Sequence, residues 1–180
     1  RYFQRPPAAG VDVGVGDDCA VLVPTPGARW LVSSDMLVEG RHFLSTVEPA
    51  RLGHKALAVN LSDLAACGAR PLAFTLALSL PAVDAAWLEG FSRGLFALAD
   101  AHDCELVGGD TTRGPLNLCI TVFGEVPAGA IRQVVDGDGV SHDRIPSSAS
   151  IALRRSSGQM ARRAACSSSS DLPTPCGPAI

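Results

Sequence analysis

The sequence predicts an α/β fold of the two-layer α+β type, in which helices cover a mixed β-sheet, followed by a disordered tail. Three observations predict it. Short apolar stretches of strand-like composition alternate with two long stretches of helical period. Gly, Pro and Asp separate these stretches, as is typical of turns and helix caps. The composition of the chain then changes near residue 130.

The first part of the chain is expected to hold two short strands and a helix. Residues 19–23 and 30–34 are predicted strands, joined by a turn at the segment PTPG. Pro49 can begin a helix that runs to about Cys67, because apolar residues recur there at helical spacing. Gly68 is suited to end that helix.

The second part is expected to add three strands and another helix. Residues 72–80 form an apolar, β-rich strand. Asp84 can cap a helix that extends to about His102. Residues 104–107 form a strand that runs into GGDTTRGP, and residues 116–126 form the last strand. Strands interleaved with two amphipathic helices predict a sheet covered by helices.

The last 50 residues differ from the rest. All nine aromatic residues lie at or before Phe123, and ten serines occur in residues 141–180 against six in residues 1–129. Such a segment cannot bury enough apolar surface to offset the entropy lost on ordering. We therefore predict a folded domain over residues 1–129 and a disordered, Ser/Arg/Pro-rich tail over residues 130–180.

Composition argues against several classes of protein. The net charge of −3 gives no basic footprint for nucleic acid, and no apolar run reaches the ~18 residues that would indicate a membrane span. None of the six cysteines forms a C-x-x-C pair, which argues against zinc. With no signal peptide at the start, these cysteines predict a reducing, cytoplasmic setting.

Four aspartates occupy positions where a carboxylate needs an explanation. Asp18 precedes the first predicted strand, Asp35 closes the second, and Asp110 follows another. Asp63 lies within an otherwise apolar helix, where burial of an unpaired carboxylate would cost several kcal/mol. Asn60, three residues earlier, shares its helical face, so this face is expected to meet polar groups. Each has an ordinary alternative: Asp18 as a turn residue, Asp35 as a strand-end cap, Asp110 as a turn residue, and Asp63 as the partner of Lys55.

Taken together, acids at several segment ends favour a hard cation. Mg²⁺ takes oxygen ligands and bridges to substrate phosphates, so the pattern favours phosphate chemistry. In GGDTTRGP, Gly108 and Gly109 would let backbone amides approach an anion, and Thr111, Thr112 and Arg113 could donate to phosphate. No G-x-x-x-x-G-K-[ST] loop occurs, and the glycines of GVGVGDD precede a strand, which argues against a dinucleotide fold.

Four motifs carry a resemblance to a known family: GVGDDCAVL, SSDMLVEGRHF, KALAVNLSDLAACGARP and LVGGDTTRGPL. In this order and spacing they resemble the N-terminal half of thiamine-monophosphate kinases. These enzymes share a superfamily with aminoimidazole ribonucleotide synthetase and selenophosphate synthetase. The resemblance covers about residues 1–129, and EGRHF and GGDTTRG point to the thiamine branch.

The resemblance implies the N-terminal-domain fold of aminoimidazole ribonucleotide synthetase and the ATP- and Mg²⁺-dependent phosphorylation of thiamine monophosphate to thiamine diphosphate. It also implies a homodimer that pairs through the N-terminal domain. His42 matches a substrate-contacting position, Gly109 and Asp110 match the nucleotide contact, and no residue is assigned as a protein nucleophile or base. The matched magnesium-binding positions are Asp18, Ser33, Ser34, Asp35, Asp63 and Asp110.

The chain departs from the family after FGEVPAG. The family continues into a second α/β domain with further metal and ATP ligands, whereas this chain reads AIRQVVDGDG, with Arg132 out of register for the expected ATP contact. A shift of reading frame would explain the change. Three functions stay open: a thiamine-monophosphate kinase seen as a truncated chain deficient in catalysis, a non-catalytic binding or dimerisation module, and another ATP-dependent member of the superfamily.

Overall fold

The computed structural model describes residues 2–5 and 10–130. The predicted disordered tail, and with it the test of a domain boundary at residue 129, falls outside these residues. The described elements follow the order β1, β2, β3, α1, β4, α2, β5, β6. This is the two-layer arrangement of sheet and helices that the sequence predicts.

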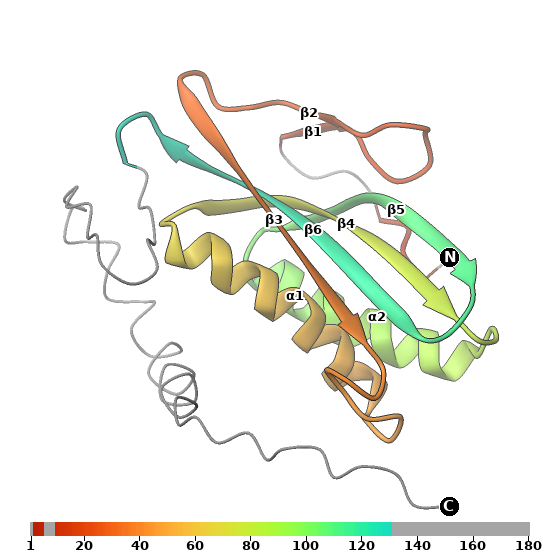
Figure 1. Cartoon of the computed structure of the whole chain (residues 1–180). Coiled ribbons are helices and arrows are strands. Elements are labelled where there is room, and N and C mark those ends of the chain that lie inside the picture. Colours follow the sequence, from red (N-terminus) through yellow and green to blue (C-terminus); the bar gives the residue numbers. More distant parts are fainter. Residues whose placement is uncertain (1, 6–9, 131–180) are drawn as a thin grey trace, which may run out of the picture. The chain divides into compact units, whose positions relative to one another are not determined.

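A mixed sheet of four strands forms one layer (Figure 1). Its strands lie in the order β3 (Ala28–Val38), β6 (Asn117–Pro127), β4 (Arg70–Leu80) and β5 (Glu105–Arg113). β6 pairs antiparallel with both β3 and β4, and β4 pairs parallel with β5. β3 and β5 are therefore the two edges of the sheet.

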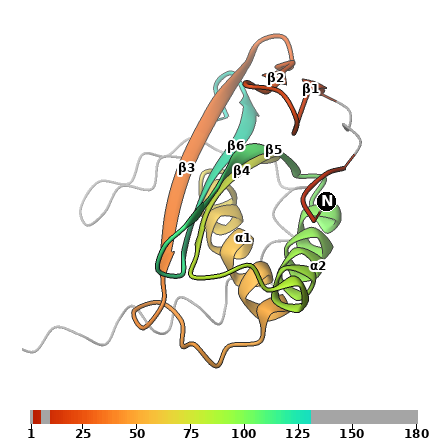
Figure 2. The same cartoon turned by 90° about the vertical axis from the view of Figure 1, so that its right-hand side faces the viewer.

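Two helices form the other layer, and both cover the same face of the sheet (Figure 2). α1 spans Pro49–Ala66 and α2 spans Ala85–Ala101, close to the predicted bounds. Proline begins α1, and the Asp84 carboxylate caps α2 by accepting hydrogen bonds from the backbone N–H groups of Ala86 and Trp87. Neither of these described helices is long and apolar enough to cross a membrane.

The two helices pack with their backbones in close contact. A Cβ atom added to Gly53 of α1 would lie 2.1 Å from the carbonyl oxygen of Phe91, and one added to Gly94 of α2 would lie 1.9 Å from that of Ala50. Glycine is therefore required at both positions by the helix–helix distance.

The main core fills the space between the helices and the sheet. Its fully buried members come from both helices and from the two central strands β4 and β6. The largest of these side chains are Phe74, Phe91, Leu52, Leu57, Leu64, Leu78, Leu95, Leu118, Ile120 and Val122.

A short ribbon of β1 (Val11–Val13) and β2 (Val21–Leu22) packs on the face of the sheet that the helices leave free. Val11 is buried there against Ala73 and Val107. β2 is much shorter than the predicted strand over residues 19–23, and it pairs with β1, which has no predicted counterpart. The PTPG turn does lead into β3, but β3 takes β6 as its partner along all of its length.

Two predicted strand ends are wrong. β3 continues to Val38, so Asp35 lies inside the strand rather than closing it. β5 extends through Arg113, so Gly108–Arg113 forms an edge strand rather than a loop. In both cases pairing with a long neighbouring strand, β6 or β4, carries the strand through Asp or Gly, residues that have low local strand preference.

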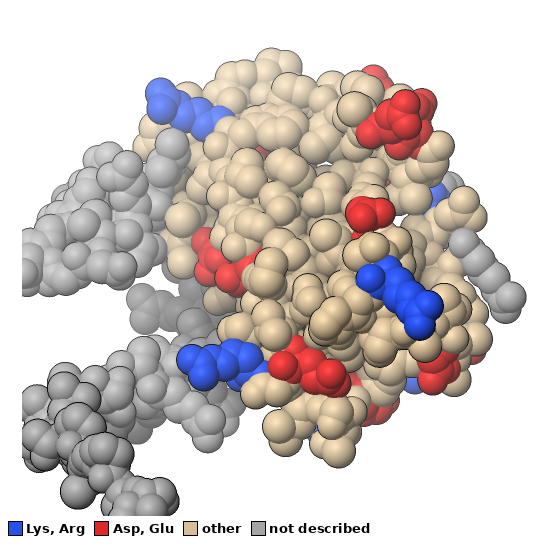
Figure 3. All heavy atoms as spheres, turned by 45° about the vertical axis from the view of Figure 1, so that its right-hand side comes forward, with Lys and Arg blue, Asp and Glu red and all other residues tan. Residues whose placement is uncertain are grey.

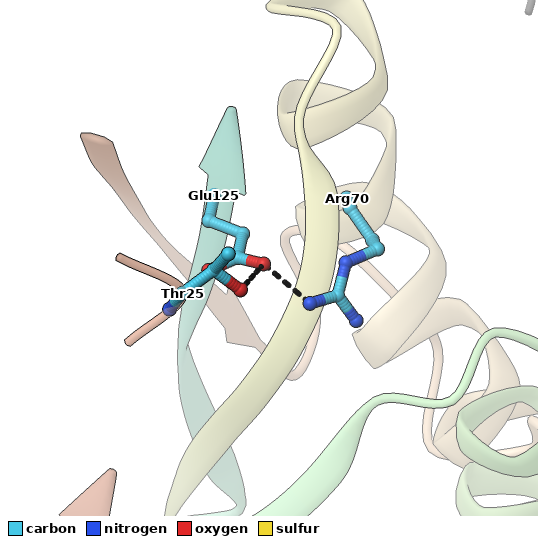
Figure 4. A network of polar contacts seen from close by, with 3 residues as sticks. All are labelled: Thr25, Arg70 and Glu125. Atoms are coloured by element: carbon cyan, nitrogen blue, oxygen red, sulfur yellow. Dashed lines mark hydrogen bonds and ion pairs between the residues drawn. The ribbon is translucent and has the colours of Figure 1, made fainter. Parts of the chain in front are cut away.

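A buried carboxylate holds one end of the sheet together (Figure 4). Glu125 of β6 is only 6% exposed, and it accepts hydrogen bonds from the Thr25 hydroxyl (2.7 Å) and backbone N–H (3.2 Å). It also forms an ion pair with Arg70 at the start of β4. The Thr25 hydroxyl, followed by Arg70, holds the pKa of Glu125 below its usual value in spite of burial. These contacts tie the turn before β3 to β6 and β4.

Candidate functional site

Polar side chains meet where β3 lies against α1, a region that we call the β3–α1 seam and define by Ser33, Asp35, His42, Asn60 and Asp63. The Ser33 hydroxyl donates to Asp63 Oδ2 at 2.6 Å. The amide oxygen of Asn60 accepts from the backbone N–H of Asp35 at 3.2 Å. The seam therefore brings together four of the residues that the sequence singled out, with His42 beside them.

The periodicities of strand and helix produce this meeting. Ser33 and Asp35 are two residues apart in β3, so both face the helices, whereas Ser34 faces the other way. Asn60 and Asp63 are three apart in α1 and share one face of the helix. Asn60 is fully buried, and its Nδ2 donates to the carbonyl oxygen of Ala56 at 3.0 Å, so both ends of its side chain are satisfied.

The seam carries excess negative charge. Burial raises the pKa of Asp35, the nearby Asp63 carboxylate raises it further, and His42 opposes these effects. Lys55 does not serve as the ion-pair partner considered for Asp63, because its Nζ instead donates to the carbonyl oxygen of His42 at 2.5 Å. A cation placed at the seam would therefore be attracted by two carboxylates.

His42 lies in the turn that follows β3. Its Nδ1 accepts the backbone N–H of Val38 at 3.0 Å, so a neutral ring carries its proton on Nε2. The ring can then offer one N–H donor to a ligand beside the seam. This geometry suits the substrate contact that the resemblance implies for His42.

Gly109 and Asp110 lie on the opposite edge of the sheet, in β5. Gly109 has φ +140°, and a Cβ atom there would lie 1.9 Å from the carbonyl oxygen of Leu76, so the approach of β5 to β4 already requires a glycine. A cavity of about 400 Å³ adjoins this edge, and its lining includes Val15, Gly109, Asp110 and Thr111. The sequence predicted a phosphate-binding loop over GGDTTRGP. The structure instead has an edge strand over most of this segment, with the cavity beside it.

Asp18 lies in the loop between β1 and β2, where it is exposed and its backbone N–H donates to Asp17 Oδ1 at 2.8 Å. Val15 of the same loop lines the cavity beside Asp110. The loop that carries Asp18 thus belongs to the β5 side of the domain rather than to the β3–α1 seam.

The predicted metal-binding residues therefore fall into two groups. Asp35 and Asp63 lie together with Ser33, whereas Asp110 lies three strands away, about 14 Å at ordinary strand spacing. Across residues 2–5 and 10–130, no three His, Cys, Asp or Glu side chains come close enough to hold one metal ion. Within one chain, the described residues therefore bring two of the four aspartates, Asp35 and Asp63, close together.

The predicted residue Ser34 belongs to neither group. It lies on the face of the sheet opposite the helices, where its hydroxyl is 2.9 Å from the Thr121 hydroxyl and 3.3 Å from the carbonyl oxygen of Ile120. Large apolar side chains of β3 are exposed on this face, which we call the open face and define by Val32, Ser34, Met36, Val38, Ala77, Cys119 and Thr121.

The open face is a feature that the sequence reasoning missed. Val32 and Met36 are 59% and 56% exposed, although they lie in a strand whose other face is buried. The signal was present in the sequence, because Trp30, Val32, Met36 and Val38 lie on one face of the strand while Leu31 and Leu37 lie on the other. A strand that is apolar on both faces usually meets a partner on each.

Charged side chains are sparse on the face shown in Figure 3. Acidic side chains form small groups within a mostly uncharged surface, and Lys and Arg are few and far apart. Phosphate groups bound on this face would have few basic side chains to meet.

Comparison with known proteins identifies the family of the fold. Residues 16–126 match the family described as AIR synthase related protein, N-terminal domain. The thiamine-monophosphate kinase of Salmonella typhimurium is 54% identical over 131 residues, which is 72% of this chain and 40% of that protein. The chain thus spans about 40% of the length of this curated relative.

Solved structures give the same likeness. The crystal structure of thiamine-monophosphate kinase from Stenotrophomonas maltophilia has a TM-score of 0.66 and 50% identity, over 69% of this chain and 40% of that one. A structure described as AaThiL complexed with AMPPCP and TMP has a TM-score of 0.54 and 31% identity, over 57% and 34% of the two chains.

Proposed function

The chain belongs to the family of AIR synthase related proteins, whose N-terminal domain its residues 16–126 match. We therefore propose that it forms the metal- and nucleotide-binding part of a thiamine-monophosphate kinase. Such an enzyme transfers the γ-phosphoryl group of ATP to thiamine monophosphate and yields thiamine diphosphate. The observation that carries the proposal is the 54% identity over 131 residues to a kinase of that name. The family match over residues 16–126 includes every candidate site residue.

We propose Mg²⁺ as the metal, because the matched side chains offer only oxygen donors. Ser33, Asp35 and Asp63 would hold it at the seam, and Asp18 and Asp110 would complete the set, whereas the Ser34 hydroxyl faces the other side of the sheet. Bound Mg²⁺ would offset the charge that develops on the transferring phosphoryl group. The side chains fit this use, since Asp35 and Asp63 gather negative charge that Lys55 leaves unpaired.

The residues of the seam would act by positioning rather than by covalent chemistry. The Nε2–H of His42 would donate to an oxygen of the acceptor substrate and orient it beside the carboxylates. Asn60 keeps Asp35 in place by binding its backbone N–H. Positioning and charge compensation are the main requirements of phosphoryl transfer, which needs no protein nucleophile.

We propose that two copies of the chain pair through the open face to complete each site. Asp110 cannot share an ion with Asp35 across about 14 Å of one sheet. If two sheets pair about a two-fold axis, the β5 edge of one copy can approach the β3 edge of the other. Asp18 and Asp110 of the partner subunit would then meet Asp35 and Asp63. The exposed apolar side chains of β3 support such a pairing.

The substitution Met36→Lys should separate the proposed dimer. It would place a charge among the exposed apolar side chains of the open face, and we expect dimer affinity to fall by about 100-fold. Sedimentation velocity would measure the change. Val83→Lys, at an 86% exposed residue outside the open face, is the matched control and should leave the dimer intact. A wild-type chain that stays monomeric would contradict the pairing.

ATP is proposed to bind on the β5 side. Gly109 and Asp110, the matched nucleotide-contacting residues, line the cavity of about 400 Å³. The structure titled as a complex with AMPPCP and TMP supports this choice of ligands for a similar domain. The parallel pairing of β4 and β5 keeps Gly109 close to β4 and so fixes where a nucleotide could approach.

A chimera tests the proposed function. Residues 1–129 joined to the C-terminal part of the Salmonella relative should form thiamine diphosphate from ATP and thiamine monophosphate, and only with Mg²⁺ present. A polypeptide of these 180 residues should show no useful rate, because correct placement of reactants supplies roughly 7–11 kcal/mol of barrier lowering and much of it is expected from the other domain.

Two outcomes of that experiment would favour the alternatives. A chimera that transfers the γ-phosphoryl group of ATP to a different acceptor would indicate another ATP-dependent member of the superfamily. A folded, dimeric chimera that binds no nucleotide would indicate a non-catalytic module. Full turnover by the 180-residue polypeptide would contradict the expected deficiency.

We propose a reducing, cytoplasmic setting for this reaction. The cysteines in the described part of the chain, Cys19, Cys67, Cys104 and Cys119, are all free thiols. Burial raises the pKa of Cys104 to about 12, so this thiol packs as an inert core residue. Free thiols both in the core and on the surface support a compartment in which disulfides do not form.

A further inference from the structure

We propose that Lys55 is a positioning residue that fixes the orientation and the tautomer of His42. Lys55 lies on α1, whereas His42 lies in the turn after β3. The inference rests on the proposed function only for the identity of the ligand that His42 would contact. The effect of Lys55 on the imidazole is independent of that ligand.

The turn that carries His42 is closed by backbone hydrogen bonds. The N–H of His42 donates to the carbonyl oxygen of Val38 at 2.9 Å, and the N–H of Gly40 donates to that of Phe43 at 2.8 Å. Phe43 is buried and holds the far side of the turn in the core. His42 itself is exposed, so its backbone needs another tether.

Lys55 provides that tether. Its ammonium group donates to the carbonyl oxygen of His42 at 2.5 Å and so joins the turn to α1. A hydrogen bond from a charged donor is about twice as strong as one between neutral groups. Two further N–H donors of the ammonium remain for other acceptors, such as the oxygens of a phosphate ester.

The imidazole depends on the same turn geometry. Two hydrogen bonds join Val38 to His42. The Val38 carbonyl oxygen accepts from the backbone N–H of His42, and the Val38 N–H donates to the imidazole Nδ1 at 3.0 Å. This second bond occupies the Nδ1 lone pair and leaves the ring proton on Nε2. Lys55 holds the carbonyl group of His42, and without that bond the His42 backbone can rotate, which would break the Val38–Nδ1 bond and let the proton reside on either nitrogen. Lys55 thereby controls which nitrogen faces the ligand.

Nitrogen-15 NMR of the full 180-residue chain tests this at alkaline pH, where imidazoles are neutral. The wild-type His42 should show the Nε2–H tautomer, Lys55→Met should show a mixture of both tautomers, and Lys55→Arg should restore the single form. The amide of Val38 should exchange about tenfold faster in Lys55→Met. Arg51→Met, which removes a neighbouring cation of α1 paired with Glu48, is the control and should change neither signal.

Titration with thiamine monophosphate separates this inference from the proposed function. Lys55→Met should weaken binding by about tenfold and Lys55→Arg should recover most of it. If no chain binds the compound but the tautomer changes as described, the proposed substrate is wrong and the role of Lys55 stands. If Lys55→Met is folded, by its dispersed amide spectrum, and retains the Nε2–H tautomer, Lys55 does not position His42. Should Lys55→Met unfold, a Lys55→Arg chain with mixed tautomers would overturn the proposal.

Discussion

Gly53→Ala is expected to lower the free energy of unfolding by at least about 2–3 kcal/mol. The added Cβ would lie 2.1 Å from the carbonyl oxygen of Phe91 and 2.9 Å from the backbone nitrogen of Leu95. Both are backbone atoms of α2, so no side-chain rotation can relieve the overlap. The helices would have to separate, which would open voids around Phe91 in the main core.

The sign of this effect makes the test informative. Within a helix, alanine is more favourable than glycine by about 1 kcal/mol, so an uncrowded site would gain stability. Gly90→Ala is the graded control, because its Cβ would lie 3.1 Å from the side chain of Pro49 and no nearer than 3.8 Å to the backbone of Ala50. Urea unfolding of the full chain gives both values. A Gly53→Ala chain as stable as the wild type would show that the helices do not pack this closely.

Asp63→Asn is expected to reduce kinase activity of the chimera by about 100- to 1000-fold. The change keeps the size of the side chain but removes its negative charge. The carboxylate that is lost accepts a hydrogen bond from the Ser33 hydroxyl at 2.6 Å and lies near Asp35. An amide is a much weaker ligand for Mg²⁺ than a carboxylate, so affinity for the metal and charge compensation should both decrease.

The control for this change is Asp84→Asn. Asp84 caps α2 away from the seam, and asparagine caps a helix almost as well, so activity should be retained. Asp63→Asn should not lower the stability of the fold, because removal of one carboxylate relieves the repulsion that raises the pKa of Asp35. Activity that partly returns at high Mg²⁺ would support a role in metal binding. Full activity at low Mg²⁺ would exclude Asp63 from the site.

The sequence predicted the helices better than the strands, for a physical reason. Helix ends depend on local chemistry: Pro49 begins α1 and Asp84 caps α2, within one or two residues of the expected bounds. Strand ends depend on partners far away in the chain. β1 has only three residues, and it is a strand because β2 pairs with it and Val11 is buried against Ala73.

The same distinction applies to the site. Spacing alone put Asn60 and Asp63 on one face of a helix and required polar partners for them, and β3 supplies these partners through Asp35 and Ser33. Local patterns could not reveal that Asp110 lies at the other edge of the sheet, because the strand order follows from tertiary pairing. The sequence predicted Gly109 as a ligand-binding glycine. The structure gives another reason for glycine there, because a Cβ atom would overlap the carbonyl oxygen of Leu76 in the neighbouring strand.

The placement of Asp35 and Asp110 on opposite edges of the sheet has a genetic consequence if sites are shared between two copies. A cell with two damaged alleles, one altered at Asp63 and the other at Asp110, would assemble mixed pairs of chains. In each mixed pair, one site would receive both altered residues. The other site would receive an intact Asp63 from one chain and an intact Asp110 from the other. Two alleles that are inactive alone could therefore complement each other, and either lesion would behave as recessive beside an undamaged copy.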